Sequence, residues 1–128
     1  MKKYIAYQGS EYTIEWYYDR RAKSRALAYY LDLTDDRKRK VMSLFRLMAT
    51  HAKIHDETKF RYEGDNIYAF KPQPDRYLCF FFMGKKIIVT NAFEKRTQKM
   101  REQEKDRALK AYDDYEMRIA QGMYYEKE

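Results

Sequence analysis

Three apolar runs separated by two turn signals fill the segment Asn66–Lys99 and constrain the fold more than any other part of the chain. Pro72 and Pro74 mark a hairpin loop, because proline donates no backbone hydrogen bond and is excluded from central strands. Gly84 marks a second, tight turn. The middle run is apolar on both faces, which is typical of a strand covered on both sides. The sequence therefore predicts a three-stranded antiparallel meander with strands Ile67–Phe70, Arg76–Met83 and Lys86–Phe93.

Before the meander, the pattern changes from strand to helix. Tyr12–Tyr17 is aromatic and β-branched and predicts a strand. The first ten residues form an extension that either pairs with this strand as a hairpin or stays loose.

From Asp19 the apolar residues take helical spacing, with Leu27, Tyr30 and Leu31 on one face. Thr34 is the expected N-cap of a second helix. The apolar stripe of that helix consists of Val41, Leu44, Phe45 and Met48. Two helices joined by a short loop predict an αα-hairpin, and residues 58–65 are expected to form a polar connection to the meander.

The last third of the chain predicts one long helix, over residues 98–121, with Gly122 as its stop signal. Its apolar stripe is narrow and consists of Ala108, Tyr112, Tyr115 and Ile119. The chain has no internal repeats and no Gly/Ser-rich linker. Residues 1–128 are therefore expected to form a single α+β domain.

Charge limits the kind of partner that suits this chain. The 128 residues carry a formal net charge of +7, and 45% of them are hydrophobic, which is enough for a folded core. Excess positive charge suits an anionic partner, either nucleic acid or an acidic protein segment; alternatively it is only a solvated basic surface. We find no signal peptide and no membrane-spanning run, so the chain is expected in the cytoplasm without a membrane partner.

Metal and nucleophile chemistry have little support in the sequence. Cys79 is the only cysteine and lies in an apolar run, so it is expected to be a buried hydrophobic residue, and no intramolecular disulfide or cysteine-based zinc site is possible. His51 and His55 are four residues apart, but further metal ligands are missing nearby. No metal or cofactor is expected. If the chain is an enzyme, its working groups are cationic and phenolic.

Cationic side chains follow the ends of the predicted strands. In an antiparallel meander, the end of one strand and the start of the next lie at the same edge of the sheet. The residues in question are Lys71, Arg76, Lys95, Arg96, Lys99 and Arg101. They either converge into a cluster that holds a phosphate through charge-assisted hydrogen bonds, or remain separate strand-end charges.

The order of elements and three short motifs resemble the RelE/ParE toxin superfamily, and within it the HigB-like, phage-derived branch. The motifs are Ile67–Lys71 at the end of one strand, Asp75–Leu78 at the start of the next, and Phe93–Lys99 at the exit from the sheet. The resemblance covers about Tyr12 to Tyr115. Departures from the branch include Lys71, where arginine is usual.

This resemblance implies a RelE-like fold and the toxin of a type II toxin–antitoxin pair. Such a toxin is a metal-independent endoribonuclease that cuts mRNA on the ribosome and so inhibits translation, restrained by a small antitoxin that often carries a helix-turn-helix. Residue by residue, it implies catalytic roles for Arg76 and for Lys95 or Arg96. The expected RNA contacts are Lys71, Tyr68, Tyr77, Lys99 and Arg101, although the two tyrosines suit core packing equally well. No residue stands out as a general base.

Two other functions fit the sequence. One is a ParE-like toxin that acts on DNA gyrase without cutting RNA. The other is a non-toxic basic module that binds nucleic acid.

Overall fold

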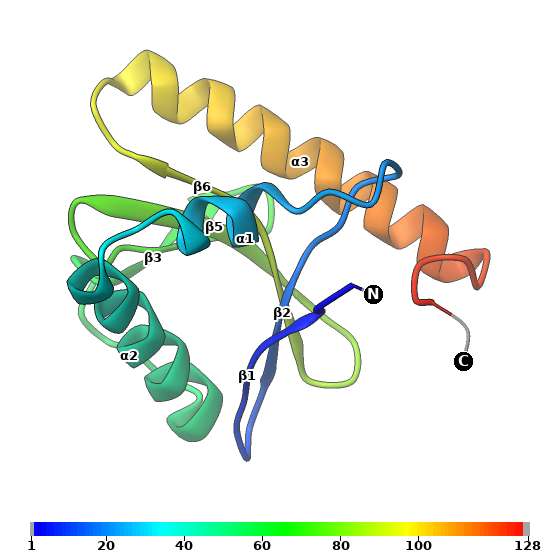
Figure 1. The fold of residues 1–128 in the computed structure, drawn as a ribbon, viewed down its shortest axis with the longest axis horizontal. Helices are drawn as coiled ribbons and strands as arrows, with labels where there is room; N and C mark the ends of the chain where they lie inside the picture. Colours follow the sequence, from blue (N-terminus) through cyan, green and yellow to red (C-terminus); the bar gives the residue numbers. More distant parts are fainter. Residues whose placement is uncertain (1, 127–128) are drawn as a thin grey trace.

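The computed structural model describes residues 2–126, which form an α+β fold with one six-stranded mixed sheet and three helices (Figure 1). The elements are β1 (Ile5–Gln8), β2 (Thr13–Trp16), α1 (Arg25–Leu31), α2 (Asp35–His51), β3 (Phe60–Gly64), β4 (Ile67–Phe70), β5 (Asp75–Phe82), β6 (Lys86–Glu94) and α3 (Gln98–Ala120). The strand order is β1-β2-β6-β5-β4-β3. The α+β class and the long C-terminal helix agree with the sequence prediction.

The predicted meander forms, but it has one more strand than expected. Strands β4, β5 and β6 pair antiparallel in succession, within one residue of the predicted bounds. The expected polar connection at 58–65 is wrong, because Phe60–Gly64 forms the edge strand β3 beside β4. On the other side, β2 pairs parallel with β6 and β1 pairs antiparallel with β2. The opening residues therefore form the hairpin rather than a loose extension.

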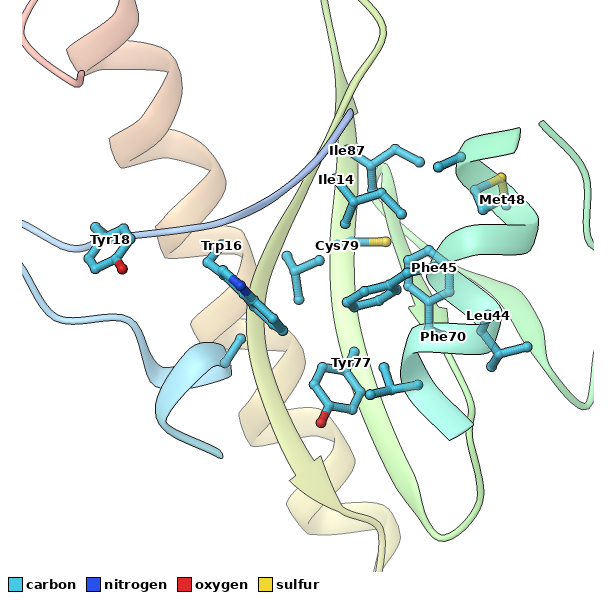
Figure 2. Packing of buried hydrophobic residues seen from close by; sticks show 14 residues of the cluster. Ile14, Trp16, Tyr18, Leu44, Phe45, Met48, Phe70, Tyr77, Cys79 and Ile87 are labelled. Atoms are coloured by element: carbon cyan, nitrogen blue, oxygen red, sulfur yellow. The ribbon is translucent and has the colours of Figure 1, made fainter. Parts of the chain in front are cut away.

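Alternating side chains divide the core into two layers, one on each face of the sheet. In Figure 1 the sheet lies between α2 on one side and α3 on the other. The layer shared with α1 and α2 contains Trp16, Phe45, Phe70 and Tyr77 among its largest members (Figure 2). Cys79 lies in the same layer and is buried, as expected.

The second layer joins the sheet to α3. Its members include Leu78, Phe80, Phe93 and Tyr115. The predicted α3 stripe is correct at Ala108 and Tyr115, while Tyr112 and Ile119 are only half-buried, and Ala111 is buried instead. Through Ala108, Ala111 and Tyr115 this layer holds α3 against β4, β5 and β6.

Helix α2 begins after the N-cap that the sequence predicts, and α1 and α2 cover different strands. The Thr34 hydroxyl accepts a hydrogen bond from the Arg37 amide at 3.4 Å, as expected for an N-cap. Helix α1 packs on β6, whereas α2 packs on β1 and β2. Leu31, expected on the core face of α1, is 59% exposed at the helix end. No helix within residues 2–126 has the length and apolar character needed to cross a bilayer.

Gly9 fixes the β1–β2 hairpin against the end of α2. Two amides of the turn, of Glu11 and Tyr12, donate to the Ala49 carbonyl at 2.8 and 3.0 Å. A Cβ atom on Gly9 would overlap that same carbonyl, and backbone cannot rotate away as a side chain can. We expect Gly9→Ala to lower the free energy of unfolding by about 1–3 kcal/mol, the usual cost of overpacking. Urea denaturation measures this change. Ser10→Ala is the matched control, since Ser10 is exposed; a loss below about 0.5 kcal/mol for both variants would contradict the prediction.

Candidate functional site

A small basic cavity of about 50 Å³ opens on the α3 face of the sheet, beside the N-terminal half of α3. We call it the basic cavity. Its walls carry five cationic side chains and one carboxylate above an apolar floor. The lining residues are Arg61, Glu63, Ala69, Lys71, Arg76, Leu78, Phe93, Lys95 and Arg101.

Strand alternation explains why cations from three strands meet here. Residues two apart on a strand share a face, and the apolar floor faces α3. Lys71 lies two residues beyond Ala69, Arg76 two before Leu78, and Lys95 two beyond Phe93. Each of these cations therefore continues, at the end of the sheet, the face that packs on α3. The pairing of Arg76 with Phe93 across β5 and β6 aligns the strand ends.

Arg76 is a half-buried residue of the cavity wall. Its guanidinium donates to the Gln73 side-chain oxygen at 3.1 Å and to the Asp75 carbonyl at 3.0 Å. It forms no ion pair with any residue between 2 and 126. Burial lowers the pKa of Arg76, and the positive charge of Arg101 lowers it further. An anion in the cavity would relieve this repulsion.

Lys71 is in a similar electrostatic position. Its ammonium donates to the Glu57 carbonyl at 3.1 Å. Burial lowers the pKa of Lys71, and the charges of Arg76 and Arg61 lower it further. A lysine with a lowered pKa gives up its proton more readily, which suits a proton donor in catalysis.

Glu63 and Arg61 belong to the site but were not predicted from the sequence. Both project from β3, the strand that was read as a polar connection. The Glu63 carboxylate accepts hydrogen bonds from the Arg101 guanidinium, and its side chain is only 9% exposed. The alternation of aromatic and charged residues in Phe60–Glu63 was the available signal for a strand.

The structure places four of the expected site residues outside the basic cavity. Tyr77 is fully buried on the opposite face of the sheet, beside Trp16 and Phe45 (Figure 2), and its hydroxyl has no hydrogen-bond partner within residues 2–126. A base cannot stack on a ring in that position. Tyr68 lies on the same opposite face, half-buried against Phe60 and Phe81. Arg96 is 72% exposed and pairs with Glu94 at 3.0 Å, and Lys99 is exposed on α3.

A buried ion pair lies directly behind Arg76. Asp75 is 0% exposed and pairs with the Arg37 guanidinium of α2, while the Tyr29 hydroxyl of α1 donates to it at 2.6 Å. This network anchors the start of β5 to both helices. It therefore fixes the backbone from which Arg76 extends.

The arrangement supports anion binding better than metal binding. Five cations around one small cavity can hold a phosphate through several charge-assisted hydrogen bonds. Within residues 2–126, no three His, Cys, Asp or Glu side chains are grouped to hold a metal ion. His51 and His55 are both exposed.

Comparison with known families identifies the relatives of this chain. The family model described as phage-derived protein Gp49-like (DUF891) matches residues 28–113, about two thirds of the chain. The chain belongs to this Gp49-like family. The family is of the toxin–antitoxin, RelE-like kind, which agrees with that part of the sequence prediction. The matched segment of the Gp49-like protein includes every residue that lines the basic cavity. None of the curated proteins compared with the sequence matches it.

Proposed function

We propose that this Gp49-like protein is the toxin of a type II toxin–antitoxin pair and cleaves mRNA on the ribosome. The observation that carries the proposal is the half-buried guanidinium of Arg76, which is one of five cations around one small cavity and forms no ion pair within residues 2–126. A site of this kind can bind one phosphodiester group through several charge-assisted hydrogen bonds. Family membership supports the toxin assignment, and the choice of RNA cleavage rests on the cavity.

Cleavage without a metal needs three actions at one phosphodiester. The 2′-hydroxyl must lose its proton, the phosphate must bind cations as its charge increases, and the leaving 5′-oxygen must gain a proton. The 2′-oxygen then bonds to phosphorus and the bond to the 5′-oxygen breaks, which leaves a 2′,3′-cyclic phosphate and a 5′-hydroxyl.

The cavity offers one group for each action. Arg76 binds the phosphate, with Lys95 as the second cation in place of Arg96, which lies outside. Glu63 is the one carboxylate among the lining residues and accepts the 2′-hydroxyl proton. Lys71, with its lowered pKa, protonates the 5′-oxygen. Arg101 holds Glu63 in place.

The proposal includes the restraint of this activity. A small antitoxin with an acidic segment would neutralise the basic cavity by folding over it, as disordered segments do on binding. Both partners would then act in the cytoplasm.

Growth of bacteria that express the protein tests this function. We expect the wild type to arrest growth and to leave cleaved transcripts, and Arg76→Ala to abolish both effects. Arg46→Ala is the matched control, because Arg46 is exposed on α2 away from the cavity. Growth arrest with intact transcripts and damaged DNA would favour a gyrase-directed toxin instead. Harmless expression of the wild type would favour a basic binding module.

A further inference from the structure

A second basic hollow lies on the other side of α3 from the basic cavity. It has a volume of about 340 Å³ and lies between the loop that precedes α1 and the middle of α3. We call it the basic groove. Figure 1 shows this loop beside α3. The cationic residues that line the basic groove are Arg20, Arg21, Lys23, Arg25, Arg107 and Lys110.

The two hollows are separate sites on opposite flanks of one helix. Arg101 pairs with Glu63 of β3 on one flank, whereas Asp114 pairs with Arg20 of the loop on the other. Between them, the stripe Ala108, Ala111 and Tyr115 packs on the sheet. Arg101 and Lys110 are nine residues apart, about 14 Å along the helix axis.

Hydrogen bonds of Asp19 fix the backbone of the loop that precedes α1. The Asp19 carboxylate accepts hydrogen bonds from the amides of Arg21 and Lys23, at 2.9 and 3.0 Å. The Asp19 amide in turn donates to the Lys23 carbonyl at 2.8 Å. These bonds use backbone groups, so they leave the Arg21 and Lys23 side chains available for a ligand.

Positive charge in the groove is largely unpaired. Its two acidic residues are already engaged: Asp19 holds the loop, and Asp114 binds Arg20, Arg118 and the Tyr17 hydroxyl. Arg21, Lys23, Arg25 and Lys110 form no ion pair with residues 2–126. The Arg107 Nε atom is buried without a hydrogen-bond partner in that same range, and its one charged neighbour is the Glu104 carboxylate at 3.7 Å.

We propose that the basic groove binds the phosphate backbone of RNA, independently of the cleavage site. Four of its six cations are arginines, whose planar guanidinium groups bind phosphate oxygens in pairs. Contacts of this kind position a protein on RNA without reading its sequence. The choice of RNA over an acidic protein rests on the proposed function: a protein that reaches mRNA inside the ribosome has ribosomal RNA around it, so phosphates face more than one of its sides.

Binding to an uncleavable RNA probe tests the groove. We use a fluorescein-labelled single-stranded oligoribonucleotide with 2′-O-methyl groups, which lacks the attacking hydroxyl, and measure fluorescence anisotropy over a range of KCl concentrations. Arg21→Ala/Lys23→Ala should weaken binding about tenfold and lower the slope of log K against log salt by about 1.4, since each lost phosphate contact removes about 0.7. Arg46→Ala/Lys53→Ala removes the same charge from two exposed positions, one on α2 and one just after it, and should leave both quantities near the wild-type values.

The outcomes separate this inference from the proposed function. If the wild type cleaves no RNA but the groove variant still loses probe binding, the proposed function fails and the groove stands. If the groove variant binds the probe with wild-type affinity and slope, or the control variant loses as much, the groove is not an RNA site. If the groove variant loses binding to an oligoglutamate peptide but keeps probe binding, the groove belongs to an acidic protein segment and the RNA assignment is overturned.

Discussion

Replacing Asp75 by alanine is expected to lower the free energy of unfolding by about 3–5 kcal/mol, the range measured when one partner of a buried ion pair is removed. Asp75 is fully buried, and both the Arg37 guanidinium and the Tyr29 hydroxyl bond to it. Arg37 keeps 28% of its side chain exposed and can turn partly to water, so the lower end of the range is expected. Urea unfolding followed by circular dichroism measures the loss.

Asp36→Ala is the matched control for this prediction. Asp36 is 67% exposed and pairs with Arg39 and Lys40 at 3.8 and 3.6 Å. Exposed pairs of this kind contribute less than about 1 kcal/mol. If Asp75→Ala cost no more than Asp36→Ala, the network behind Arg76 would not anchor the start of β5.

Replacing Glu63 by glutamine is expected to slow RNA cleavage by about 10²–10⁴-fold, the usual contribution of a general base. Glutamine keeps the shape of the side chain and can still accept a hydrogen bond from Arg101, so the fold and the position of Arg101 should persist. Single-turnover cleavage of ribosome-bound mRNA measures the rate.

Glu116→Gln removes the same charge from an exposed position on α3 and serves as the control. An equal effect of the two substitutions would point to net charge rather than to proton transfer. A Glu63→Gln variant that cleaves at the wild-type rate would remove Glu63 from the mechanism, while leaving the cation cluster to hold the phosphate.

Local signals in the sequence identified most of the elements but not their neighbours in space. The proline loop and Gly84 located β4, β5 and β6, and the stripe from Val41 to Met48 located the buried face of α2. Edge strand β3 was missed because two of its five residues are exposed and it carries two charges. Because β3 was not predicted, Glu63 was not recognised as a residue of the site.

The sequence also could not predict which face of the sheet carries the site. Alternation places Arg76 and Tyr77 on opposite faces, but only the packing of α3 decides which face holds the basic cavity. Tyr77 was therefore expected to contact RNA although it lies in the core. The partner of Asp75 could also not be predicted, because Arg37 is 38 residues away in the sequence and no local pattern links the two residues.

The central claim is that the basic cavity cuts mRNA on the ribosome, and mapping of RNA ends in a reconstituted system tests it most directly. Purified protein is added to ribosomes stalled on a defined mRNA, and new ends are located by primer extension. We expect new 5′-hydroxyl ends within the ribosome-covered segment for the wild type and for Arg46→Ala, and none for Arg76→Ala. Intact mRNA with folded wild-type protein, or equal cleavage by Arg76→Ala, would contradict it.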